Sequence, residues 1–184
     1  MKHYIVQVRL YHITPEIWRR FRVPAHVTFD RFHEILQRAM GWENRYEHEF
    51  RYGKGKYLRD VIAPPHPDRF LTADSFTDET TITLESFVGR AHLPKRFLYL
   101  YDYADEWLHE ISVEKTEILE NEDIKMLDAA RACPPEACGG HLEYLELCSG
   151  NANWYEGIWD AEAFDLTSVD FSPKKKAKKR AKKD

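Results

Sequence analysis

The residues with the most evident chemical potential are two cysteines and two histidines. Cys133 and Cys138 are separated by four residues, while His48 and His109 lie on strand faces that are otherwise apolar. Zinc binds thiolate and imidazole in tetrahedral sets of four, and a short loop with two cysteines commonly supplies half of such a site. We therefore hypothesise a zinc site, structural or catalytic, in which the two thiols meet the two imidazoles.

A simpler reading of the same residues requires no metal. Buried cysteine packs as a small hydrophobic residue, and the Pro134-Pro135 and Gly139-Gly140 pairs can serve only to shape a tight loop. A histidine on an apolar strand face can be a hydrogen-bonded core residue. Geometry separates the two readings, because zinc ligands have to converge within about 4 Å of one another.

A second candidate is an acidic window in the middle of the chain, formed by Asp102, Asp105, Glu106, His109 and Glu110. Paired carboxylates with a histidine can perform acid–base chemistry or hold a hard divalent ion. Strand alternation, however, places Asp102 and Glu110 on the face opposite His109. Carboxylates in a turn commonly accept hydrogen bonds from backbone amides, so turn formation beside a solvated face is the favoured explanation.

No stretch of the sequence specifies a reaction. It has no Gly-x-Ser-x-Gly elbow, no phosphate-cradling glycine loop and no dinucleotide fingerprint, and we predict no catalytic residue. Arg19, Arg20 and Arg22, interleaved with Trp18 and Phe21, are the nearest approach to an anion-binding patch. They can equally snorkel from an amphipathic segment.

The charge of the chain is divided. The net charge is −4, but residues 174–184 hold eight basic residues and one acid, which leaves −11 on the first 173 residues. Such a segment is expected to be disordered in isolation and to bind DNA or RNA without sequence preference by releasing counterions. The alternatives are a nuclear-import signal, a membrane-surface contact or a solubilising end. The basic residues are Lys174, Lys175, Lys176, Lys178, Lys179, Arg180, Lys182 and Lys183.

The cysteines, the start of the chain and the lack of a long apolar run bear on where the protein is located in the cell. Three cysteines clustered late in the chain argue for reduced thiols. The pattern at the start is a strand rather than a secretory leader, and no apolar run approaches the ~20 residues of a membrane span. We expect a cytoplasmic protein.

The elements that position these residues centre on residues 96–117, which predict a β-hairpin. Elsewhere the periodicity predicts strands over 2–12 and 48–52, a strand ending at Pro24, a further strand over 57–62, and a helix over Phe29–Met40 between a Thr28 cap and Gly41. Short helices are expected after Thr83, around 142–147 and after Asp160, a loop over 64–79, and helix or loop over 120–132. The hairpin faces hold Phe97, Tyr99, Tyr101 and Tyr103 on one strand, and Trp107, His109, Ile111 and Val113 on the other.

This pattern predicts an α+β fold with a mainly antiparallel or mixed sheet, a central hairpin and several packed helices. Residues 1–173 are expected to form a single domain, followed by a basic tail at 174–184.

Four stretches in order resemble the plasmid pRiA4b ORF-three-like family across nearly all of residues 3–171. They are ITPEIWRR at 13–20, the helix ending at Trp42 with HEF at 48–50, YDYADEWLH at 101–109 and CPPEACGG at 133–140. The resemblance implies a small α+β domain of bacteria and archaea, often encoded near mobile elements and without an established activity. Some relatives are labelled passenger proteins of insertion elements.

Two positions depart from the family pattern. Ala104 stands where the family usually has glycine, and Ala137 where it usually has aspartate. If that glycine served a left-handed turn, alanine would cost about 1 kcal/mol.

Two functions follow as expectations. The first is a binding or interaction domain in a mobile-element setting, whose acidic body docks a protein partner while its tail contacts nucleic acid. The alternative is a zinc-dependent enzyme or a zinc-stabilised fold. Whether the chain catalyses any reaction stays open.

Overall fold

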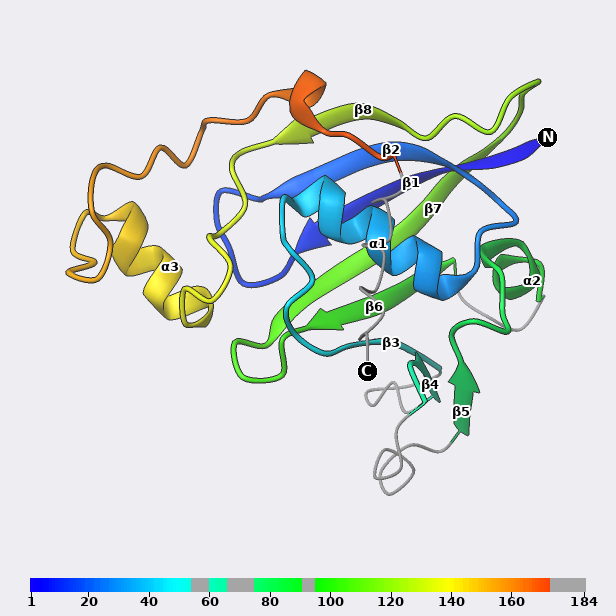
Figure 1. Cartoon of the computed structure of the whole chain (residues 1–184), viewed down its shortest axis with the longest axis horizontal. Coiled ribbons are helices and arrows are strands. Elements are labelled where there is room, and N and C mark those ends of the chain that lie inside the picture. Colours follow the sequence, from blue (N-terminus) through cyan, green and yellow to red (C-terminus); the bar gives the residue numbers. More distant parts are fainter. Residues whose placement is uncertain (54–59, 66–74, 91–94, 173–184) are drawn as a thin grey trace, which may run out of the picture.

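The computed structural model describes residues 1–53, 60–65, 75–90 and 95–172. The described strands form one mixed β-sheet, and a helix lies across one of its faces (Figure 1). The strands are β1 (Lys2–Leu10), β2 (Trp18–Pro24), β3 (His48–Tyr52), β4 (Asp60–Ala63), β5 (Ser75–Asp78), β6 (Arg96–Tyr101), β7 (Trp107–Ile118) and β8 (Lys125–Ala130). The helices are α1 (Phe29–Met40), α2 (Leu84–Val88) and α3 (Gly140–Cys148), with a 3₁₀ turn over Leu166–Ser168.

The described strands run in the order β5-β4-β3-β6-β7-β1-β2-β8. Neighbours are antiparallel except for β4 and β5, which are parallel. The β6–β7 hairpin lies near the middle and pairs Tyr99 with His109 and Tyr101 with Trp107. The predicted α+β fold, mixed sheet and central hairpin are therefore confirmed.

Helix α1 crosses one face of the sheet and covers an aromatic core (Figure 1). Its buried stripe repeats with the helical period, and Phe29 packs edge-on against Phe50 with ring centroids 4.9 Å apart. Gly41 ends the helix in the left-handed region (φ 86°), which glycine adopts without a Cβ penalty. Thr28 occupies the N-cap position, although its side chain makes no capping hydrogen bond.

A buried arginine connects α1 to strands β2 and β8 at one edge of the sheet. Arg19 donates 2.9 Å hydrogen bonds to the carbonyls of Trp18, Ala39 and Ala130. Its guanidinium carbon lies 3.8 Å from the centroid of the Phe164 ring, a cation–π contact. One side chain thus joins β2, β8, α1 and the C-terminal segment.

The three arginines that came nearest to an anion-binding patch in the sequence do not share a face. Arg19 is fully buried in the core, whereas Arg20 and Arg22 project from the opposite side of β2 and pair with Glu114 and Glu117 at 2.6 and 3.9 Å. Strand alternation separates them.

Two segments expected to lack strands contain them. Strand β5 lies within the predicted loop over 64–79 and pairs with β4. Strand β8 lies within 120–132, buries Met126 and pairs with β2. Lysine, aspartate and alanine are poor strand formers, so β8 depends on backbone pairing that local sequence does not signal.

Three smaller expectations are also corrected. The helix expected after Asp160 is absent from the described residues, which show only the 3₁₀ turn, capped by Asp165. Strand β6 ends at Tyr101, so Tyr103 is exposed in the turn instead of lining the strand. The strand expected over 57–62 begins at Asp60, and residues 54–59 lie outside the described part of the chain.

Two further expectations hold. Helix α2 begins with a capping box between Thr83 and Ser86, and α3 forms where a helix was predicted. Of the helices described, none is both long and apolar enough to cross a membrane.

We expect Arg19→Met to lower the free energy of unfolding by about 3 kcal/mol, because one buried and two partly buried carbonyls lose a charged donor. Arg20→Met, next along the same strand, should cost less than about 1 kcal/mol, since its ion pair is solvated. Urea denaturation of both variants checks this. Equal losses would show that the buried guanidinium does not join these elements.

Candidate functional site

Three of the motif segments meet around one buried indole. Trp42 stacks on Tyr101 with ring centroids 5.1 Å apart and lies 6.1 Å from Trp107. It also meets His109 edge-on at 5.4 Å, and its Nε1 donates a 2.9 Å hydrogen bond to the carbonyl of Pro134. The end of α1, the hairpin and the cysteine loop therefore form one junction, which we call the motif junction.

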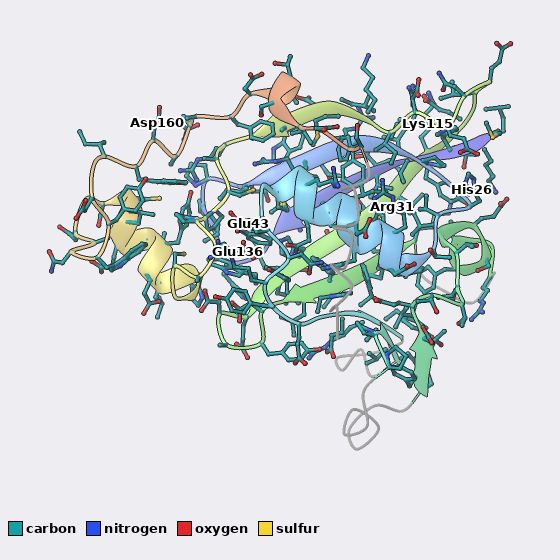
Figure 2. All side chains as sticks on the ribbon, viewed as in Figure 1. His26, Arg31, Glu43, Lys115, Glu136 and Asp160 are labelled. Carbon is teal, nitrogen blue, oxygen red and sulfur yellow. The ribbon has the colours of Figure 1, made fainter. Side chains whose placement is uncertain are left out.

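A carboxylate completes the motif junction. Glu136 accepts a hydrogen bond from the Tyr101 hydroxyl and others from the backbone N–H groups of Glu43 and Arg45, at 2.7 and 3.3 Å. Figure 2 shows Glu136 beside Glu43, near the end of α1. Burial, reinforced by the bond to Glu136, raises the pKa of Tyr101. The phenol therefore stays protonated and donates to the carboxylate.

The hairpin turn docks on the cysteine loop through backbone groups. Asp105 accepts a 3.0 Å hydrogen bond from the N–H of Gly139, and a Cβ on Gly140 (φ 90°) would stand 3.0 Å from the Asp105 carbonyl. Asp102 accepts hydrogen bonds from the N–H groups of Ala104 and Asp105 at 3.0 and 3.3 Å. These carboxylates shape the turn and its contact.

The structure resolves the two departures from the family pattern. Ala104 does not have a positive φ, so alanine there carries no left-handed penalty, whereas Ala137 has a φ of 62°. The remaining acids of the window lie elsewhere: Glu106 is in the turn, and Glu110 bonds Arg9 at 3.1 Å on the opposite face. The acidic window therefore does not gather into one site.

A second polar cluster adjoins the motif junction beneath α1. The rings of His33 and His48 stack with centroids 3.4 Å apart and planes 3° apart. Nε2 of His48 lies 2.7 Å from Glu79 Oε2, and Nδ1 of His33 lies 2.8 Å from the Tyr99 hydroxyl. A hydrogen-bonded imidazole–carboxylate pair is an arrangement that can transfer a proton.

Hydrogen bonds around His33 connect this cluster to the neighbouring segments of the chain. Gln37 donates to the Tyr99 hydroxyl at 2.9 Å and accepts from the N–H of Asn44 at 3.0 Å. The Asn44 side chain in turn bonds His33 Nε2 at 2.8 Å. Burial, together with the nearby His48, lowers the pKa of His33 to about 3, so this imidazole is neutral and acts as a connector.

The predicted thiol ligands have separate partners. Cys133 Sγ accepts a 2.9 Å hydrogen bond from Arg19 and lies 3.7 Å from Met40 Sδ. Cys138 Sγ lies 3.9 Å from the Gly140 carbonyl. Burial raises the pKa of Cys133 to about 11 and that of Cys138 to about 12, so both thiols are protonated near neutral pH.

The predicted histidine ligands stand on strands that are not neighbours. His48 is on β3 and His109 on β7, with β6 between them, and alternate strands lie about 10 Å apart. His109 Nδ1 bonds the Tyr99 carbonyl at 3.2 Å, and burial lowers its pKa to about 4. The described ranges contain no group of three or more histidine, cysteine or acidic side chains placed to hold a metal. The four residues therefore do not form the expected zinc site.

The sequence analysis missed five polar residues of the two clusters: His33, Gln37, Asn44, Glu79 and Glu136. His33 lies next to the apolar residues of α1 on the buried side of the helix, and this position could have identified it. Glu79 lay in a segment read as loop, and Glu136 was read only as part of a loop-shaping motif.

The tail residues 174–184 lie outside the described part of the chain, but the segment leading to them is fixed. Arg38 donates to the carbonyl of Asp170 at 2.8 Å and Arg31 to that of Phe171 at 3.0 Å. The ring of Phe171 packs 6.1 Å from that of Phe21. The chain therefore leaves the folded body beside α1, where Figure 2 labels Arg31.

The buried histidines predict a pH dependence. His33 and His109 have folded-state pKa values of about 3 and 4, below the unfolded value of about 6.5. Unfolding therefore takes up protons below about pH 6.5. As the pH falls further, each of these histidines should lower the free energy of unfolding by up to about 1.4 kcal/mol per pH unit. Urea denaturation between pH 7.5 and 5 measures this slope.

His33→Gln should flatten that slope, while the same change at exposed His26 should leave it unaltered. A stability that is constant or rises as the pH falls to 5 would contradict the assignment.

Comparison with known proteins places the chain in a family. The family described as plasmid pRiA4b ORF-3-like protein matches residues 2–170. The uncharacterized protein y4hQ of Sinorhizobium fredii is 36% identical over 149 residues, which are 80% of this chain and 72% of y4hQ. A crystal structure of MM3350, a protein of unknown function from Methanosarcina mazei Go1, is similar with a TM-score of 0.77 at 28% identity.

That structural similarity covers 92% of this chain and 97% of MM3350. Residues 2–170, which the family model matches, include the whole described sheet and the three segments of the motif junction. The resemblance expected from the sequence is confirmed, and the chain belongs to the plasmid pRiA4b ORF-3-like protein family.

Proposed function

We propose that this chain is an interaction domain whose cationic tail binds nucleic acid without sequence preference. The separation of charge along the chain supports this most directly. Eight basic residues follow position 173, whereas the first 173 residues sum to −11. Phosphates attract the tail and repel most of the body, so binding should concentrate on the tail.

The anchoring of the preceding segment supports the same proposal. Arg31 and Arg38 of α1 hold the carbonyls of Phe171 and Asp170, so the tail begins at a fixed point of the body. A basic segment attached in this way positions the domain on a phosphate backbone without reading bases. The mobile-element setting implied by the family resemblance agrees with contact to nucleic acid.

The buried clusters support a structural role beside this function. In the network around His33, the polar atoms of Gln37, Tyr99 and Asn44 bond to one another. Such closed networks specify a unique packing.

Deleting residues 174–184 should weaken binding to a 30-base-pair DNA duplex at least 100-fold at 50 mM salt. For the full chain, log Kd should rise with log salt concentration, with a slope of at most about 7 if all eight charges contact phosphate. Fluorescence anisotropy with labelled DNA measures both effects.

Two matched variants control for composition. A full-length chain with the tail order scrambled should bind as the original does, and one with the tail lysines changed to glutamine should bind as the truncated chain does. Equal binding by full-length and truncated chains would remove the proposed role of the tail. Preference for anionic vesicles over DNA would favour the membrane-surface alternative.

A further inference from the structure

Helix α3 and the loop after it carry apolar side chains that face solvent. The helix projects from one end of the sheet (Figure 1). Only Gly140, Tyr144 and Leu147 of this helix are buried, whereas Leu142 and Leu145 are 62% and 42% exposed. Because only this narrow stripe of α3 is packed against the protein, the rest of the helix surface is exposed to solvent.

The loop after α3 adds two large exposed side chains. Trp154 is 50% exposed and Ile158 is 97% exposed. Isolated exposed apolar residues are ordinary on protein surfaces, but four within one short segment are a concentration of the kind found at interaction sites. We call Leu142, Leu145, Trp154 and Ile158 the apolar surface.

The apolar surface borders a pocket with aromatic walls. The pocket has a volume of about 320 Å³, and its lining includes Leu147, Cys148, Tyr155, Ile158 and Trp159. Tyr155 meets Trp159 at a ring-centroid distance of 5.8 Å with planes at 90°. Concave sites lined by aromatic rings are where apolar anchor residues of a partner bind most strongly.

The segment that carries the apolar surface is acidic. Between Arg131 and Lys174 the sequence has eight carboxylates and neither lysine nor arginine. Glu143 and Glu146 lie on the exposed side of α3, and Glu156 is exposed in the loop beside Trp154. Exposed carboxylates therefore accompany the apolar side chains that an occupant would contact.

We infer that the apolar surface is a docking site for a partner protein segment with large apolar anchors flanked by lysine or arginine. Complementary charge attracts such a segment and like charge disfavours others. A second copy of this chain would bring two acidic surfaces together, and nucleic acid would be repelled. The site is distinct from the tail and does not depend on its proposed function.

A displayed library of random 12-residue peptides, selected on the full-length protein, tests this. Counter-selection against the Trp154→Ala/Ile158→Ser double variant isolates the peptides that need the apolar surface. We expect these peptides to be enriched in lysine or arginine together with leucine, phenylalanine or tryptophan. The best of them should bind the double variant at least 10-fold more weakly than the original protein.

The exposed thiol of Cys148 gives a second readout, since Cys133 and Cys138 are buried. A bound peptide should slow its reaction with an aromatic disulfide reagent at least 5-fold. Ile118→Ser, at another exposed apolar position on β7, is the matched control and should leave both readouts unchanged.

Several outcomes would overturn the inference. Selected peptides that tolerate the double variant, or that need it but show no excess of basic residues, would do so. Dimerisation abolished by Trp154→Ala/Ile158→Ser would assign the surface to a second copy. Affinity that rises at least 10-fold after deletion of residues 174–184 would assign it to the chain's own tail.

Discussion

A single buried indole holds three of the family's motif segments in place. Trp42 follows the left-handed Gly41 that ends α1, stacks on Tyr101 of the hairpin and donates to the carbonyl of Pro134 in the cysteine loop. Glu136 adds a carboxylate that receives the hydroxyl of Tyr101. These contacts join segments that are distant in sequence, and so they fix how the helix, the hairpin and the loop meet.

The polar groups beneath α1 form hydrogen bonds with one another. Burying an amide, a phenol or an imidazole is costly unless it is hydrogen-bonded, and His33, Gln37 and Tyr99 meet that requirement through one another. A network of this kind rigidifies the fold. Both binding roles that we propose therefore lie outside the core, on the basic tail and on the apolar surface.

The parts of the fold that the sequence predicted have long, regular periodicity. Helix α1 and the β6–β7 hairpin bury clear stripes, and the α+β class follows from them. Strands β5 and β8 escaped prediction because their formation depends on a partner strand supplied from elsewhere in the chain. Such tertiary pairing is invisible to local propensity.

The site was predicted less well than the fold. The sequence correctly placed His48 and His109 on buried strand faces, but burial does not fix the distance between them, and β6 separates their strands. The partners that matter for His48 and Tyr101 are Glu79 and Glu136, which come from segments without periodicity. These two contacts depend on the geometry of loops, which cannot be predicted from a single sequence.

A double-mutant cycle tests the central claim most directly, namely that the Tyr101–Glu136 bond acts with Trp42 to hold the motif junction together. The unfolding free energies of Tyr101→Phe, Glu136→Gln and the double variant would be compared with that of the original protein. A coupling of at least about 1 kcal/mol is predicted, because a carboxylate acceptor strengthens the bond. Additive effects within about 0.3 kcal/mol would contradict the account.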